Sequence, residues 1–323
     1  ANTSALAFKA VIFFWIVVLM SVIVLLTAEI SRAGTPITLY RSFAGNVDYV
    51  GAGGTLRTQS NAVNPCAVTT SGSGTLSGIP AGASIRAAYL YWAGAYSAAL
   101  GSTQTTPDYN VTFAGQNINA DRTFTETFAY NGTDYDYFSG VKDVTTIVAA
   151  RGNGIYNFAG LSVNTGTPHC AVQAVVAGWS LVVIYEDASQ PLRVVNVFDG
   201  FQYYRGSEIV LIPSNFQIPT NPIDGKHSCI SWEGDVENSA PLNGFTENLL
   251  FNGNPLIDGY NPLNNQFNSS INFLGSTNAH GVDFDAYDIS AYLTAGDTSA
   301  ISAYRSGGDL VLLSAEVISV TNT

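Results

Sequence analysis

The chain has 323 residues, of which 46% are hydrophobic and only 11% are charged, and its formal net charge is −12. This composition excludes intrinsic disorder, because disordered chains are poor in aromatic residues, whereas this one contains 17 Tyr and 17 Phe. It also argues against nucleic acid as a partner, since 12 basic residues against 24 acidic ones cannot neutralise phosphates. With so few charges, the polar surface must consist of Thr, Ser, Asn, Gly and Tyr, which is typical of exported proteins.

The first predicted element is a hydrophobic helix over residues 1–34. Within it, Ala10 to Ala28 is a run of 19 residues without a charge. As a helix this run is about 28 Å long, close to the hydrocarbon thickness of a bilayer. Three interpretations compete: a cleavable signal, for which the run is too long, a retained signal anchor, and a pilin-like helix that packs against identical helices in a filament core. We expect the helix to be retained, and its large side chains to pack in the membrane or against other helices: Phe13, Phe14, Trp15, Met20 and Leu25.

Residues 35–323 predict one extracytoplasmic domain that is mainly β. Gly34 and Pro36 end the helix, and short runs rich in β-branched and aromatic residues then alternate with Asn-Gly and Asp-Gly turns. This pattern favours an antiparallel β-sandwich or jelly roll. Only Val141–Ala150 and Asp285–Leu293 suit a short helix, and the Asn-rich stretch 252–270 is predicted to be an inserted loop.

Three cysteines give an odd count. We predict a disulfide between Cys66 and Cys170, which both lie in Gly-, Ser- and Thr-rich surroundings, with Cys229 free or bonded between chains. The alternative is three buried thiols. Asn-x-Ser/Thr sequons at Asn110, Asn131 and Asn268, besides one at Asn2, are candidate glycosylation sites in a host that glycosylates.

Catalytic motifs are absent from the sequence. Its three histidines are far apart, and no nucleophile, zinc or phosphate-loop motif occurs. We therefore expect no enzyme activity, no catalytic residue and no cofactor. The one candidate metal site is the acidic run Asp283, Asp285 and Asp288, whose carboxylates suit calcium. The favoured alternative is a strand end followed by a helix N-terminus, where carboxylates complement the dipole.

Two aromatic groups allow either a sugar-stacking platform or ordinary core packing. They are Tyr89, Tyr91 and Trp92 in one strand, and Tyr203 and Tyr204 in another. Side chains alternate between the two faces of a strand, so core packing is the expected role for at least half of them.

Three segments carry a resemblance to a known family: Ile79–Trp92, Ala177–Glu186 and Gly307–Val317. They resemble the N-terminal β-domain of bacterial adhesin-like cell-surface proteins. The resemblance implies an extracellular β-sandwich without catalysis, here fused to a pilin-like or signal-anchor helix.

These features together predict a non-enzymatic structural protein at the cell surface or in the periplasm, anchored by its N-terminal helix. The leading hypothesis is a pilin-like filament subunit that self-assembles into a homopolymer and serves in surface attachment. One alternative is an accessory subunit of a larger bacterial membrane complex, with its β-domain on the periplasmic face. Another is a carbohydrate-binding adhesin.

Overall fold

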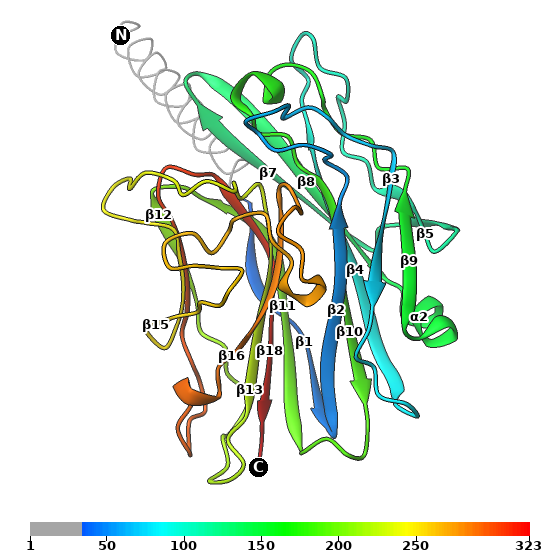
Figure 1. Cartoon of the computed structure of the whole chain (residues 1–323), viewed down its shortest axis with the longest axis vertical. Coiled ribbons are helices and arrows are strands. Elements are labelled where there is room, and N and C mark those ends of the chain that lie inside the picture. The colour runs from blue at the N-terminus through cyan, green and yellow to red at the C-terminus, as the bar shows by residue number, and fades with distance from the viewer. Residues whose placement is uncertain (1–33) are drawn as a thin grey trace, which may run out of the picture. The chain divides into compact units, whose positions relative to one another are not determined.

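The computed structural model describes residues 34–323, which form four antiparallel sheets (Figure 1). Two large sheets lie at the centre. In order of pairing, sheet I consists of β1 (Thr35–Gly45), β11 (Arg193–Tyr204), β18 (Val311–Thr321), β13 (Gly225–Trp232) and β16 (Val282–Asp288). Sheet II consists of β2 (Val47–Thr55), β10 (Ala177–Glu186), β4 (Ser84–Tyr96), β8 (Thr133–Asp143) and β7 (Arg122–Tyr130).

Two smaller sheets and a few short helical segments complete the described residues. Sheet III consists of β12 (Ser207–Leu211), β17 (Ser302–Ser306), β14 (Asn248–Phe251) and β15 (Asn254–Pro255). Sheet IV consists of β3 (Ser71–Leu76), β9 (Gly154–Ala159), β5 (Asn110–Phe113) and β6 (Gln116–Asn119). The helical segments are α2 (Thr145–Arg151) and the 3₁₀ turns η1 (His169–Val172), η2 (Asn272–Leu274) and η3 (Ser290–Tyr292).

Three hydrophobic cores show how the sheets are layered. Sheets I and II pack face to face through side chains such as Tyr89, Val182 and Trp232. The other face of sheet II packs on sheet IV, where Trp179 stacks on Phe158. The remaining face of sheet I packs on sheet III in the third core. Because both faces of both central sheets are covered, strands such as β10 read as continuous apolar runs instead of alternating patterns.

The prediction of a mainly β, antiparallel fold is confirmed for the described residues. Of the two predicted helical stretches, the first contains most of α2, although β8 extends to Asp143. The second contains only the three-residue turn η3 after β16. The stretch 252–270 contains the short β15 and otherwise no regular element.

The membrane and filament predictions need correction. The predicted helix and its packing residues Phe13, Phe14, Trp15, Met20 and Leu25 lie outside the described residues. Within residues 34–323, no helix is both long enough and apolar enough to cross a bilayer. The predicted partners, which were a membrane, membrane subunits or a homopolymer, find no support among these residues.

Candidate functional site

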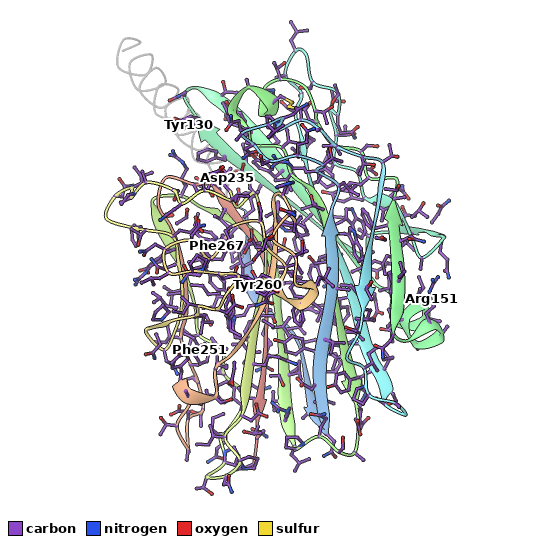
Figure 2. The ribbon with its side chains drawn as sticks, in the orientation of Figure 1. Tyr130, Arg151, Asp235, Phe251, Tyr260 and Phe267 are labelled. Atoms are coloured by element: carbon purple, nitrogen blue, oxygen red, sulfur yellow. A yellow bond between two sulfur atoms is a disulfide. The ribbon has the colours of Figure 1, made fainter. Side chains whose placement is uncertain are left out.

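A pocket of about 230 Å³ opens where sheets I and II end, near Tyr130 and Asp235 in Figure 2. We call it the aromatic–acidic pocket. Its walls come from five separate parts of the chain: Phe128, Tyr130 and Tyr135 of the β7–β8 hairpin, Val172, Gln173 and Ala174 around the end of η1, Arg205 after β11, Glu233 and Asp235 after β13, and Gly308, Asp309 and Leu310 before β18.

The aromatic wall consists of side chains on one face of β7, near the end of the strand, where the neighbouring sheet no longer covers this face. Phe128 and Tyr130 are two residues apart on β7 and therefore point to the same side. Their rings stack with centroids 5.8 Å apart, and Tyr203 of β11 meets Phe128 edge-on at 5.2 Å. Near the end of β7 this face is incompletely covered, so that Tyr130 is 37% exposed. An exposed aromatic wall beside a cavity is a surface that can bind a ligand.

Arg205 closes one side of the pocket. Its guanidinium carbon lies 5.1 Å from the ring centroid of Tyr130 and 5.9 Å from that of Phe128. Its Nε donates a hydrogen bond to the carbonyl oxygen of Gly308 at 2.7 Å. The following Gly206 has φ = 55°, and a Cβ there would come within 2.7 Å of Leu242 Cγ. Glycine is therefore needed to make the turn that carries Arg205.

The floor of the pocket is acidic. Glu233 follows the last residue of β13 and has φ = 83°, an uncommon value for a residue other than glycine. Asp309 lies in the loop before β18, and its Oδ2 accepts a hydrogen bond from the Asp235 backbone N–H at 3.2 Å. Glu233 is 4% exposed and Asp309 is 9% exposed. The nearly buried carboxyl groups of Glu233 and Asp309 thus line the cavity beside a third carboxyl group, that of Asp235.

Burial determines the protonation of this floor. It raises the pKa of Glu233 well above its usual range, and the neighbouring Asp309 and Asp235 add to the effect. Burial likewise raises the pKa of Asp309, and that of Asp235 to about 6. These raised pKa values mean that the carboxyl groups of the floor keep a proton to a higher pH than exposed carboxyl groups do.

A second layer of carboxylates lies beneath the floor. Glu247 and Asp283 are fully buried, and burial raises the pKa of both, with Asp309 among the neighbours that add to it. Phe267 N donates to Glu247 Oε1 at 2.7 Å, and Ser270 N donates to Asp283 Oδ1 at 3.1 Å. Within residues 34–323, the other oxygens, Glu247 Oε2 and Asp283 Oδ2, have no hydrogen-bond partner. Because burial raises their pKa, these two carboxyl groups favour the protonated, neutral form while no further cation is near.

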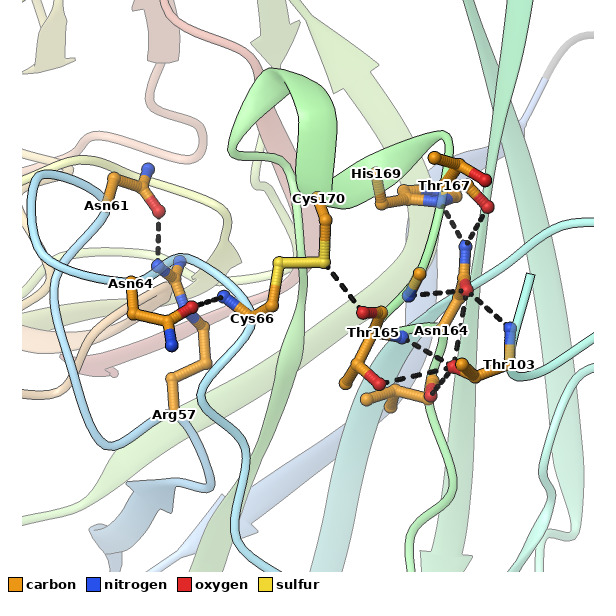
Figure 3. The surroundings of a disulfide bond; sticks show 12 residues. Arg57, Asn61, Asn64, Cys66, Thr103, Asn164, Thr165, Thr167, His169 and Cys170 are labelled. Carbon is orange, nitrogen blue, oxygen red and sulfur yellow. Dashed lines mark hydrogen bonds between the residues drawn. A yellow bond between two sulfur atoms is a disulfide. The ribbon is translucent and has the colours of Figure 1, made fainter. Parts of the chain in front are cut away.

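The predicted disulfide between Cys66 and Cys170 is confirmed, with the two Cα atoms 5.7 Å apart (Figure 3). Cys170 lies in η1, and the residues at the end of that turn form one wall of the pocket. The bond therefore ties a pocket wall to the loop after β2. Cys229 is a free thiol buried between sheets I and III. A disulfide indicates an oxidising compartment, which supports an extracellular or periplasmic location.

The structure does not bring the three predicted calcium ligands together. Asp283 and Asp285 share one face of β16 and are buried, whereas Asp288 is exposed, on the opposite face, and accepts the Ser290 backbone N–H at 2.8 Å. No three His, Cys, Asp or Glu side chains among the described residues are arranged to hold a metal ion. Asp288 instead agrees with the alternative interpretation, because it is the last residue of β16 and the helical turn η3 begins two residues later.

The sequon asparagines differ in their surroundings. Asn110 is exposed at the start of β5, and Asn131 is exposed in the β7–β8 turn beside Tyr130. Asn268 is half-buried, and its side-chain amide donates to the Tyr260 carbonyl oxygen at 2.8 Å. Glycosylation of all three stays a prediction.

The two aromatic groups for which a sugar platform or core packing was considered lie mostly in the core, the role expected for at least half of them. Tyr89, Tyr91 and Trp92 are fully buried and Tyr204 is 1% exposed. Tyr203, which is 37% exposed, is the member that reaches the pocket region, through its contact with Phe128. Sequence reasoning missed Phe128, Tyr130, Glu233 and Asp309. The available signals were the aromatic pair two residues apart in β7 and the Gly-Gly-Asp turn before β18.

Comparison with known proteins shows the family. Residues 32–321 match the model of the family described as "Protein of unknown function (DUF3344)", and the chain belongs to this family. The predicted resemblance to adhesin-like domains fused to a pilin-like helix is therefore wrong, because the matching family is a different one. No curated protein and no solved structure matches the chain. Nothing in these comparisons supports a pilus, a filament or cell adhesion.

Proposed function

We propose that this protein is a non-enzymatic, extracytoplasmic binding protein whose aromatic–acidic pocket holds a carbohydrate. The observation that carries the proposal is the combination of exposed aromatic rings with nearly buried carboxyl groups in one cavity. The C–H faces of a sugar ring pack on aromatic faces, and its hydroxyl groups donate to carboxylates and accept from guanidinium groups. The pocket offers all three kinds of contact.

The size of the pocket supports a small ligand. Its volume of about 230 Å³ lies below the ~300–1,000 Å³ of clefts for drug-sized molecules. One sugar ring, such as the end or a single unit of a longer glycan, suits this volume. Tyr130 at the rim would pack against the ring, while Arg205 and Asp309 would contact its hydroxyl groups.

The test is binding of purified full-length protein to a panel of mono- and oligosaccharides, measured by calorimetry and by saturation-transfer NMR. We expect at least one sugar to bind, and Tyr130→Ala to weaken its binding about tenfold, because stacking on an aromatic ring contributes ~1 kcal/mol or more.

Tyr260→Ala is the matched control. Tyr260 is 38% exposed, close to the 37% of Tyr130, but it lies in the loop 252–270 and does not line the pocket (Figure 2). Equal losses for the two variants, or no binding of any sugar by the wild type, would contradict the proposal.

A further inference from the structure

Acidic groups outnumber basic ones in and below the pocket. Five carboxyl groups act on one another there: Glu233, Asp235 and Asp309 in the floor, and Glu247 and Asp283 beneath it. Within residues 34–323, the cations placed beside them are Arg57 and Arg205. With only these two cations beside five carboxyl groups, burial and mutual repulsion raise the pKa of the carboxyl groups, and a further cation would favour their ionised form.

Neither arginine is free to correct this imbalance. Arg57 is 4% exposed and donates to the side-chain oxygen of Asn61, whose own amide donates to Asp235. Arg205 is held by its hydrogen bond to the Gly308 carbonyl oxygen and by its contact with the aromatic ring of Tyr130. Meanwhile Glu247 Oε2 and Asp283 Oδ2 lack partners among the described residues. A buried excess of negative charge is costly unless a cation accompanies it.

The cavity lets such a cation reach the floor from solvent. Glu233, Asp235 and Asp309 line it directly, and the Tyr130 and Phe128 rings form a wall that also attracts positive charge. A metal ion is the less suitable candidate, because no three acidic, His or Cys side chains of the described part converge in a metal-binding arrangement. An ammonium group instead donates up to three hydrogen bonds to acceptors in separate directions.

Resting on the proposed function, we propose that the pocket selects sugars that carry a protonated amine, so that its ligand class is amino sugars and not neutral or N-acetylated ones. The ammonium group binds the carboxyl floor formed by Glu233, Asp235 and Asp309. The sugar ring packs on Tyr130. Packing on the aromatic wall provides affinity for a sugar ring, and the acidic floor favours those rings that carry a protonated amine.

The experiment compares three ligands that differ at one substituent: the methyl glycosides of glucosamine, N-acetylglucosamine and glucose. Dissociation constants of the full-length protein are measured at pH 6.5 by NMR titration. We expect glucosaminide to bind at least about tenfold more tightly than either of the others, since a charge-assisted hydrogen bond replaces a neutral one. Cyclohexylamine and calcium chloride are titrated as well.

The outcomes separate the two proposals. Equal binding of all three glycosides would overturn the amino-sugar inference and leave the carbohydrate function standing. Binding of cyclohexylamine as tight as that of glucosaminide would overturn the carbohydrate function, and with it the amino-sugar class. Displacement of glucosaminide by calcium at equimolar concentration would overturn the inference in favour of a metal site. Binding of no glycoside would overturn both.

Variants that replace a carboxyl group of the floor by a neutral amide provide a second test of the inference. Glu233→Gln should lower glucosaminide affinity about tenfold and reduce its advantage over glucoside. Asp235→Asn, at a less buried position, should act in the same direction and serves where Glu233→Gln does not fold. Glu208→Gln is the control, because Glu208 pairs with Arg305 on sheet III and does not line the pocket. An unchanged glucosaminide preference in both pocket variants would overturn the inference.

Discussion

The ring of His169 stands edge-on against the ring of Tyr135, with the ring centroids 5.5 Å apart and the planes at 90°. His169 is fully buried, and the ring of Tyr137 also meets it edge-on, with the ring centroids 5.2 Å apart. The neighbouring Cys170 forms the disulfide, while Tyr135 lines the pocket. This contact therefore joins the disulfide-bonded turn η1 to the aromatic wall. Substitutions in η1 are thus expected to affect that wall.

The first prediction concerns the protonation of His169. Burial lowers the pKa of His169 to about 4. The unfolded chain binds a proton near pH 6.5, whereas the folded chain stays neutral until about pH 4, so stability is lost as the pH falls between these values. His169→Phe, which cannot be protonated, should remove about 2–3 kcal/mol of this loss. Urea unfolding at pH 8 and pH 4.5 measures it, and a variant with the same pH dependence as the wild type would contradict the prediction.

The second prediction has the opposite sign. Burial raises the pKa of Asp285 to about 7, and its Oδ2 has no hydrogen-bond partner within residues 34–323. The folded protein keeps this proton while the unfolded chain loses it near pH 4, so Asp285 reduces stability as the pH rises from about 4 to about 7. Asp285→Asn should therefore stabilise the protein at pH 8, by up to about 4 kcal/mol, and have little effect at pH 4.

Thermal unfolding of both proteins across pH 4–8 tests this. Asp288→Asn is a suitable control, since Asp288 is exposed on the other face of the same strand. A stabilisation that is independent of pH would show that the carboxylate charge of Asp285 is not its cause.

The third prediction concerns the disulfide. The bond closes a loop of 104 residues. In the chain-entropy description, its removal by the double substitution Cys66→Ala/Cys170→Ala should lower the free energy of unfolding by about 3–5 kcal/mol. Ligand affinity should fall as well, because η1 carries a wall of the pocket. Reductant should reproduce both effects in the wild type and add nothing in the double variant. Undiminished sugar binding would mean that packing of His169 alone holds this wall.

The fourth prediction concerns Gly234, between Glu233 and Asp235. A Cβ at this position would lie 2.2 Å from the Phe267 carbonyl oxygen and 2.5 Å from Asp283 Oδ2. Gly234→Ala should therefore cost about 2 kcal/mol or more, since the backbone must shift. Gly259→Ala is the matched control, because no atom lies within 4 Å of a Cβ there. Denaturant unfolding of the two variants compares them, and equal costs would show that the loop after β13 relaxes freely.

The sequence by itself determined the class of the fold and one covalent bond. Frequent strand-like runs separated by Asn-Gly and Asp-Gly turns predicted an antiparallel β protein, because these signals depend on neighbours in the chain. The β7–β8 hairpin, with its turn at Asn131 and Gly132, is an example. The pairing of Cys66 with Cys170 was predicted from the Gly-, Ser- and Thr-rich surroundings of the two residues.

Only the tertiary structure decided which side chains form the pocket. Phe128, Arg205, Glu233 and Asp309 lie up to 181 residues apart, from 128 to 309, and none belongs to a local motif. Tyr91 and Tyr130 are equally aromatic members of strands. Tyr91 is buried because sheet I covers its face, and Tyr130 is exposed because that cover ends before it. Whether a residue meets solvent, and whether a carboxyl group keeps its proton, depends on the packing of distant segments, which no local pattern encodes.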